Sequence, residues 1–378
     1  MRQSLAHSGP DRVPVFELMI NQPPAEKIMG RDMLVGIGGR VSCELLYNYV
    51  RADAVDEMID RAYDDHVSLY RELDLDAVVP PGVVLGLMFD VPEVKKVGPN
   101  RYRMQKDSEV WWEVSWDPDS DSWGEADHYL LHQGIEGMQE MVGRMEEAGT
   151  FGYTAEQVEF VKNKYAPIKD RYLLGTADVC MPNHTAWFSV FLEAMVLAPE
   201  LVERYIAATN RMMKTFVDFF HDAGFDGIIG GTDFAGTSGP FFSPAMFERF
   251  YAGPLAELVS HCASYGMPFI KHTDGNVNTM IDRLLIETGA SGFHAIEPAA
   301  GMDIVALKKN IGDRVSLWGN VDCGRLLTSG SEEEVRAETR RLIEKCSPGG
   351  GYLLSSSNSI HSGVNADLFL AMLDEARK

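Results

Sequence analysis

Short apolar runs alternate with longer amphipathic segments through the second half of the chain. Segments such as 243–266 and 279–290 carry apolar residues at every third or fourth position and end near glycine, which predicts helices. The intervening runs predict strands: LLGTADVC (173–180), FDGIIGGTD (225–233), PFIKHTD (268–274), GFHAIEP (292–298), VSLWGNVD (315–322) and GYLLSSS (351–357). This alternation predicts repeated β–α units that form a parallel sheet.

The first half is less regular. Residues 52–74 have helical periodicity and lead into LDAVV (75–79), and a further strand is expected near 83–89. Residues 95–126 alternate apolar with polar positions around Pro99 and Asn100, as a β-hairpin does. We therefore predict an α/β fold, a single (β/α)8 TIM-like barrel over 75–378 with a hairpin excursion at about 95–126. Residues 1–74 are expected to form a helical extension packed on the barrel, and an open doubly wound sheet is the alternative.

Composition narrows the classes of partner. The net charge of −22 and the lack of a basic stripe argue against nucleic acid. No apolar run is long enough to span a bilayer, and the N-terminus has no signal-like core, so we expect a cytoplasmic protein. The five cysteines form no CxxC pair, and no GxGxxG or GxxxxGK[ST] motif supports nucleotide binding.

Polar residues end most of the predicted strands. In a (β/α)8 barrel the carboxyl ends of the strands meet at one mouth, where catalytic residues gather. Helix capping explains any one Asp or Asn on its own, whereas five polar strand ends in series favour a shared site. His272 and Asp274 are two residues apart, so both can approach one metal ion or substrate group. A later strand adds Glu297 or Cys323, and such mixed donors suit zinc.

Several longer stretches resemble the uroporphyrinogen decarboxylase superfamily from about residue 75 onward. They are VPEVKKVG (91–98), the segment from GPFFSPAMF to KHTDGN (239–276), ETGASGFHAIEP (287–298), WGNVDCGRLL (318–327) and PGGGYLLSSSNSIHSGV (348–364). The resemblance implies a TIM-like barrel. The superfamily contains cofactor-free porphyrinogen decarboxylases and methyltransferases that move methyl groups to or from a corrinoid protein, often with zinc.

Individual motifs favour one branch of that superfamily. The decarboxylases carry an arginine-bearing N-terminal stretch, whereas residues 14–31 here lack the paired arginines. Asp90 is the counterpart of their catalytic aspartate. Methyltransferases that act on coenzyme M have a His-x-Cys pair where this chain has His272 and Asp274, so that particular ligand set is excluded. The resemblance is closest to the branch that looks like the demethylating component of corrinoid-dependent O- or N-demethylases.

The resemblance therefore implies an enzyme that moves a methyl group from a small O-methyl or N-methyl donor to the cob(I)alamin of a separate corrinoid protein. Its candidate residues are His272, Asp233 and Asp90 for catalysis, Asp233, Asn320, Asn358 and His361 for substrate binding, and His272, Asp274, Glu297 and Cys323 for zinc. Phe234, Phe241 and Phe242 are candidates for contact with the partner, or for core packing. A cofactor-free decarboxylase and a non-catalytic corrinoid- or substrate-binding protein are the alternatives, and a homodimer is left open.

Overall fold

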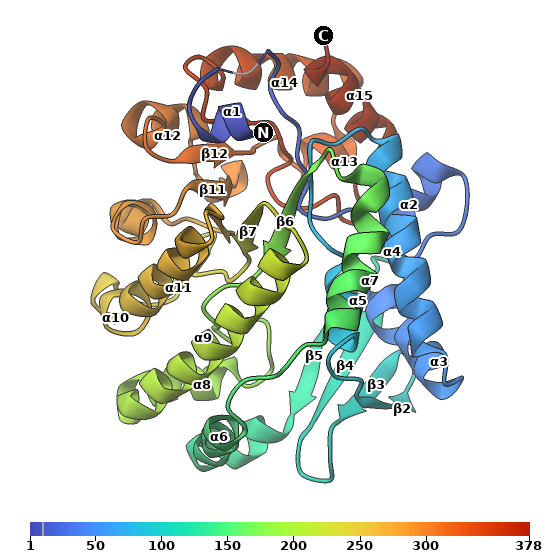
Figure 1. Cartoon of the computed structure of the whole chain (residues 1–378), viewed down its shortest axis with the longest axis vertical. Coiled ribbons are helices and arrows are strands. Elements are labelled where there is room, and N and C mark those ends of the chain that lie inside the picture. Colours follow the sequence, from blue (N-terminus) through green and yellow to red (C-terminus); the bar gives the residue numbers. More distant parts are fainter. Residues whose placement is uncertain (10) are drawn as a thin grey trace.

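Seven short parallel strands form the central sheet of this computed structural model, which describes residues 1–9 and 11–378 (Figure 1). Each predicted apolar run from residue 173 onward supplies one strand, and LDAVV supplies another. In the order in which they pair, the strands are β1 (Ala77–Val78), β6 (Tyr172–Thr176), β7 (Gly227–Gly230), β10 (Phe269–Thr273), β11 (Gly292–Ala295), β12 (Ser316–Trp318) and β13 (Tyr352–Leu353).

A segment near the N-terminus closes this sheet into a ring. Val15 forms a parallel bridge with Leu354, beside β13, and Phe16 forms one with Ala77 of β1. The Phe16 amide donates to the Leu354 carbonyl (2.9 Å), and the Asp76 amide donates to the Val15 carbonyl (2.9 Å). The two edges of the sheet are thereby joined, which confirms the TIM-like barrel. The eighth position comes from within residues 1–74, where we had expected only a helical extension.

The expected strand at 83–89 is wrong. Residues Gly82–Leu87 form helix α5. Pro80 and Pro81 end β1 and start this helix, because proline is favoured in a first helical turn and cannot donate to a strand ladder. A short apolar run does not distinguish a buried helix from a buried strand.

Two cores result from the ring. Phe16, Ile270, Trp318 and Leu353 point into the barrel with five other residues and form its interior. A larger core fills the space between the strands and the surrounding helices. Because side chains alternate across a strand, Ile270 and His272 of β10 face the interior while Lys271 faces the opposite side.

Helices surround the ring, and none in the described ranges has the length and apolarity needed to cross a membrane. Capping boxes start two of them, with Thr154 and Gln157 at α7 and Ser331 and Glu334 at α14. The α-helices not yet named are α1 (Arg2–Leu5), α2 (Gln22–Met29), α3 (Leu46–Arg51), α4 (Val55–Glu72), α6 (Tyr129–Ala148), α7 (Ala155–Tyr165), α8 (Phe188–Leu197), α9 (Pro199–Asp222), α10 (Pro244–Phe247), α11 (Gly253–Ser264), α12 (Ile304–Ile311), α13 (Leu326–Ser329), α14 (Glu332–Cys346) and α15 (Ala366–Ala376).

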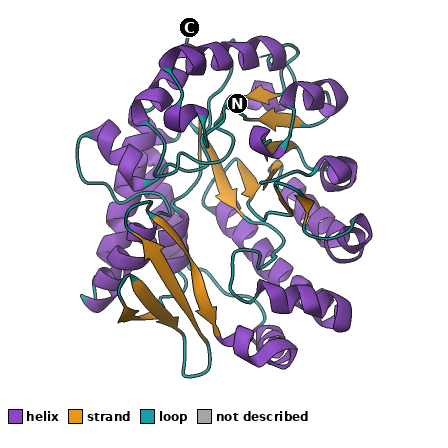
Figure 2. Ribbon diagram, turned by 180° about the vertical axis from the view of Figure 1, so that it is seen from behind, coloured by secondary structure: helices purple, strands orange, loops and turns teal. Residues whose placement is uncertain are grey.

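The excursion predicted as a hairpin is a four-stranded antiparallel sheet, which stands apart from the barrel strands in Figure 2. Its strands are β2 (Glu93–Gly98), β3 (Arg101–Gln105), β4 (Trp111–Asp117) and β5 (Ser122–His128). Asp121, in the β4–β5 turn, accepts hydrogen bonds from the Arg40 amide (2.8 Å) and the Ser362 hydroxyl (2.8 Å). The sheet is therefore attached to the loops that follow the closing segment and β13. A pair of two-residue strands, β8 (Ala235–Gly236) and β9 (Gly239–Pro240), follows β7.

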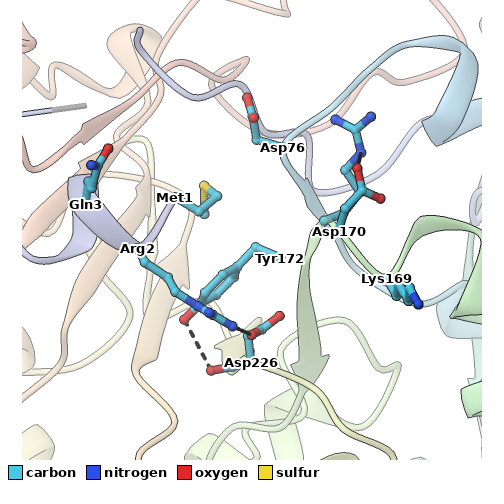
Figure 3. A pocket seen from close by; sticks show the side chains of 9 residues that line it. Met1, Arg2, Gln3, Asp76, Lys169, Asp170, Tyr172 and Asp226 are labelled. Carbon is cyan, nitrogen blue, oxygen red and sulfur yellow. Dashed lines mark hydrogen bonds and ion pairs between the residues drawn. The ribbon is translucent and has the colours of Figure 1, made fainter. Parts of the chain in front are cut away.

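A cavity of about 490 Å³ lies at the end of the barrel where the strands begin (Figure 3). Its acids and bases largely neutralise one another: Arg2 of α1 pairs with Asp226 (2.7 Å), and the Tyr172 hydroxyl donates to the Asp226 carbonyl (3.2 Å). Chemistry in this fold belongs to the other end, where the strands finish.

Candidate active site

Three predicted residues meet at the carboxyl ends of β7 and β10. Asp233, His272 and Asp274 each offer one donor atom, and these atoms all lie within 4.8 Å of one another. His272 Nε2 is 3.7 Å from Asp233 Oδ1 and 3.6 Å from Asp274 Oδ1. Asp233 and His272 are almost fully buried, and Asp274 is partly exposed. The group is therefore reachable from the mouth and shielded on its other sides.

The local backbone explains how the two acids come together. The Asp274 amide donates to Asp233 Oδ1 (2.8 Å), which ties the end of β10 to the end of β7. Gly275 follows with φ of +78°, and a Cβ there would lie 2.6 Å from the Ala235 backbone. Only glycine fits this close approach in a left-handed conformation. The sequence His-Thr-Asp-Gly thus turns the chain directly over the β7 loop.

One oxygen of the group has no partner. Asp274 Oδ1 is buried and accepts no hydrogen bond within the described chain, while Oδ2 accepts one from Asn358 Nδ2 (2.6 Å). A buried carboxylate oxygen is rarely left unpaired unless it serves a ligand. Donors about 2.0–2.2 Å from a tetrahedral zinc ion lie roughly 3.3–3.6 Å apart, close to the separations seen here. The residues therefore fit a cation held by one imidazole and two carboxylates.

Charges around the group favour an ionised Asp233. Burial raises its pKa, but the hydrogen bond from His184 and the proximity of His272 outweigh burial and bring the pKa to about 2. Burial together with the charges of Asp233 and Glu297 raises the pKa of Asp274. The hydrogen bond from His184 Nε2 to Asp233 Oδ2 (2.9 Å) raises the pKa of that histidine. The mouth therefore carries concentrated negative charge that is only partly compensated.

A buried ion pair supports the loop that carries Asp233. Lys271, which is 0% exposed, binds Asp178 and donates to the Thr232 carbonyl (2.6 Å). The Thr232 amide in turn donates to Asp178 (2.9 Å). Lys271 and Asp178 therefore position Asp233 indirectly, through their hydrogen bonds to the neighbouring Thr232 backbone. Removing either one would leave the other as an unpaired buried charge.

Glu297 and Asn358 border the group without joining it. Glu297 Oε2 accepts the Gly275 amide (3.1 Å), and Asn358 holds Asp274 as described above. Both side chains orient the loop after β10. Of the four predicted zinc ligands, the structure brings together His272 and Asp274 and adds Asp233, but it places neither Glu297 nor Cys323 among them.

Cys323 belongs to a second group, at the ends of β12 and β13. Its amide donates to Ser357 Oγ (3.2 Å), and its Sγ lies 3.4 Å from the same oxygen. His361 Nδ1 accepts the Gly363 amide (3.1 Å), so its Nε2 donates to the Cys323 carbonyl (3.1 Å). Burial raises the pKa of the Cys323 thiol to about 11, which disfavours the thiolate that metals bind. Asn320 donates to the Ile296 carbonyl (2.7 Å) and joins two strand ends.

Asp90 and two of the phenylalanines lie in other settings. Asp90 is exposed after α5 and pairs with Lys106 of the antiparallel sheet, and no hydrogen bond or ion pair within the described ranges connects it to the strand ends. Asp90 comes just before β2, the first strand of the antiparallel sheet, and so lies with that sheet and not with the barrel strands. Phe234 and Phe242 are buried core residues, because each packs edge to face or stacked on Tyr251. Phe241 is 39% exposed and contacts Phe188.

Two histidines were missed by sequence reasoning. His184 follows β6 in the loop MPNH, and His294 lies inside β11. His294 Nδ1 is 2.7 Å from His272 Nδ1. A histidine within an otherwise apolar strand, as in GFHAI, is the signal that could have identified it, because a buried imidazole needs a partner.

Comparisons with known proteins agree with this architecture. The sequence profile of the uroporphyrinogen decarboxylase (URO-D) family matches residues 179–378. A protein named uroporphyrinogen decarboxylase from Thioalkalivibrio sulfidiphilus is 30% identical over 141 residues, which cover 36% of this chain and 36% of that protein. The solved structure of a methyltransferase from Methanosarcina mazei superposes with a TM-score of 0.66 at 16% identity, over 99% of this chain and 96% of that one. That likeness concerns the fold.

Proposed function

The chain belongs to the uroporphyrinogen decarboxylase family, and we propose that within it this protein is a corrinoid-dependent methyltransferase. Its substrate is a small O-methyl or N-methyl compound, and its acceptor is the cob(I)alamin of a separate corrinoid protein. The observation that carries the proposal is the group Asp233, His272 and Asp274, with the unpartnered Asp274 oxygen. These three residues would hold a zinc ion, which would supply Lewis-acid activation of the leaving heteroatom.

The charges at the mouth support this reading over porphyrinogen decarboxylation. Asp233, Asp274 and Glu297 contribute carboxylates, whereas Lys271 is fully buried and paired with Asp178. His184, the exposed basic group, is paired with Asp233. A bound zinc ion would offset the charges of Asp233 and Asp274, but these residues still offer no free cationic side chain to anchor several substrate carboxylates, so a methyl donor without them suits the site better.

The proposed reaction is a displacement at the methyl carbon. The bond between that carbon and the donor heteroatom breaks, a bond to the cobalt of the acceptor forms, and the heteroatom keeps the electron pair and takes up a proton. The chain's part is to orient the donor and to hold charge near the heteroatom. His272, Asp233 and Asp274 would hold the cation, while Asn358 hydrogen-bonds Asp274 and Glu297 hydrogen-bonds the Gly275 amide.

The acceptor must reach the mouth from outside, because the corrinoid belongs to another protein. Phe241 is an exposed aromatic side chain on the loop after β7, the strand that also positions Asp233. Its exposure makes it the best of the three predicted phenylalanines for contact with that partner. The Methanosarcina mazei protein of similar fold is a methyltransferase, which supports the proposed reaction class.

Metal analysis with matched variants tests the proposal. Protein purified without chelator and reconstituted with zinc is compared with His272→Ala and Cys323→Ala. We expect near-stoichiometric zinc in the parent and in Cys323→Ala, because Cys323 lies outside the group, and loss of zinc in His272→Ala. Methyl transfer from methoxylated and methylamine donors to cob(I)alamin is then followed by the change in its absorption.

The opposite results have distinct meanings. Equal loss of zinc from Cys323→Ala and His272→Ala would indicate that the metal also binds to residues at the end of β12. No zinc in the parent after reconstitution would remove the metal from the proposal and give first place to cofactor-free decarboxylation. Zinc without methyl transfer from any donor in the panel, and tight corrinoid binding unaffected by His272→Ala, would indicate a binding protein.

A further inference from the structure

His272 is one end of a buried hydrogen-bonded chain. Its Nδ1 lies 2.7 Å from His294 Nδ1, and His294 Nε2 lies 3.1 Å from Ser355 Oγ. The pairing follows from the sheet, because His272 and His294 stand opposite each other in the parallel register of β10 and β11. His294 and Ser355 are both 0% exposed, so water does not replace either contact.

The short Nδ1–Nδ1 contact restricts where the protons are. Two neutral imidazoles carry one N–H each, and a hydrogen bond between two ring nitrogens needs a proton on one and a lone pair on the other. His294 is 0% exposed, and its side-chain hydrogen bonds within the described residues go to His272 and Ser355, neither of which is a carboxylate. Either His294 Nδ1 donates to His272, or His272 Nδ1 donates to His294.

The two arrangements present different atoms to the mouth. If His294 donates, His272 Nε2 carries a proton toward Asp233 and Asp274, but separations of 3.7 and 3.6 Å are too long for good hydrogen bonds. If His272 donates, its Nε2 offers a lone pair beside two carboxylates. That second arrangement suits a bound cation, and Ser355 then accepts from His294 Nε2.

Among residues 1–9 and 11–378, His272 and Ser355 are the side-chain hydrogen-bond partners of His294. Phe16 packs against its ring edge to face, with centroids 5.4 Å apart, and Trp318 packs against Phe16 in turn. These aromatic side chains fill the barrel beneath the site and hold the imidazole between His272 and Ser355. The ring is therefore fixed in orientation and has no route to solvent.

We propose that His294 is a positioning residue: its Nδ1 accepts a hydrogen bond from the His272 Nδ1–H, so that the His272 Nε2 lone pair faces a divalent cation shared with Asp233 and Asp274. This inference rests on the proposed metal-dependent function. A metal-binding histidine often donates its second ring N–H to a carboxylate or a backbone carbonyl, and here His294 would be that hydrogen-bond acceptor.

Binding of zinc and cobalt(II) to purified variants tests this role without an activity assay. His294→Phe keeps the ring volume and removes both nitrogens, and we expect affinity to fall roughly 10- to 100-fold, as for the loss of other partners behind metal ligands. His294→Asn places a carboxamide oxygen near the former Nδ1, and affinity within a few-fold of the parent is expected. His66→Phe is the matched control, since His66 on α4 is also buried.

Nitrogen-15 NMR of the histidine rings gives a readout that a purely structural role would not move. In the zinc-loaded parent we expect His272 to carry its proton on Nδ1 and to bind through Nε2. The inference is overturned if His272 binds through Nδ1, or if His294→Phe binds zinc as the parent does. It is also overturned if His66→Phe lowers the affinity equally.

Failure of the proposed function gives a different result. If the parent binds neither ion, the metal-dependent function is wrong, and the metal-free spectra then decide the role of His294. A change in the His272 tautomer in His294→Phe, with recovery in His294→Asn, would keep His294 as the residue that orients His272. An unchanged tautomer would overturn that role as well.

Discussion

The two sides of the barrel mouth carry similar residues in different states. At the ends of β7 and β10, Asp233, His272 and Asp274 converge and leave Asp274 Oδ1 without a partner. At the ends of β12 and β13, Cys323 forms hydrogen bonds with both Ser357 and His361. Donor types that bind metals occur on both sides.

The difference teaches that residue type alone does not identify a site. A polar group whose hydrogen bonds are satisfied within the chain stabilises the fold, whereas a buried group with unused capacity is available to a ligand. On this criterion we expect the β7–β10 side to bind the ligand and the β12–β13 side to stabilise the fold. Substitutions on the two sides should therefore separate metal binding from stability.

The largest effect is expected from Asp274→Ala. Removing one of three protein ligands should weaken zinc binding roughly a thousand-fold, or about 4 kcal/mol, judged from the total binding energy of zinc sites. Asp322→Ala is the control at another strand end, where the side chain accepts the amides of Gly324 and Arg325. It should lower stability by about 1 kcal/mol and leave zinc affinity unchanged. Equal zinc affinity in the parent and Asp274→Ala would remove the contrast between the two sides.

A pH-dependent effect is expected behind the β12–β13 side. Glu17 is buried in the closing segment, where it accepts hydrogen bonds from the Ser356 amide (2.9 Å) and hydroxyl (2.6 Å). Burial raises its pKa to about 8, from 4.5 for the free side chain. The unfolded chain therefore ionises first, and the folded state loses stability as the pH rises from about 4.5 to about 8.

Glu17→Gln should remove this dependence, because the carboxamide does not ionise: its oxygen accepts the Ser356 amide, and its NH2 group donates to the Ser356 hydroxyl oxygen. Between about pH 5 and pH 8.5 the unfolding free energy of the variant should gain roughly 3 kcal/mol on that of the parent. Urea unfolding at a series of pH values measures the difference. Parallel pH profiles for the two proteins would show that Glu17 is ionised in the folded state.

A smaller effect is expected from Ser357→Ala. The hydroxyl accepts the Cys323 amide, and its loss leaves that buried donor unpaired, which should lower the unfolding free energy by about 1 to 2 kcal/mol. Zinc content should not change. Denaturant unfolding and metal analysis on the same preparation measure stability and zinc content. Loss of zinc at unchanged stability would mean that the β12–β13 side binds the metal.

The smallest effect on stability is expected from Phe241→Ala. Phe241 is 39% exposed and packs on Phe188, so the unfolding free energy should fall by only about 1 kcal/mol. Binding of a corrinoid protein, measured by titration calorimetry, should weaken several-fold if the loop after β7 contacts the partner. Leu370→Ala on α15 is the matched control, since Leu370 is also 39% exposed. Equal weakening by both variants would count against this contact.

The sequence by itself determined the strands of the second half and the residues at their ends. Apolar runs bounded by glycine predicted β6, β7 and β10 to β13, because such runs are buried on both faces in a parallel barrel. The spacing of His272 and Asp274 predicted that both could approach one metal ion or substrate group, and the two donor atoms lie 3.6 Å apart. Family motifs predicted the barrel and the membership of the uroporphyrinogen decarboxylase family.

Tertiary structure alone decided the contacts between segments far apart in the chain. Val15 and Phe16 close the ring by pairing with Leu354 and Ala77, which lie about 340 and 60 residues further along the chain. No local pattern encodes such distant partners. The register of β10 against β11 paired His272 with His294, and the path of the loop after β12 directed Cys323 to Ser357. Local periodicity specifies which face a side chain takes, whereas its partner depends on how separate strands align.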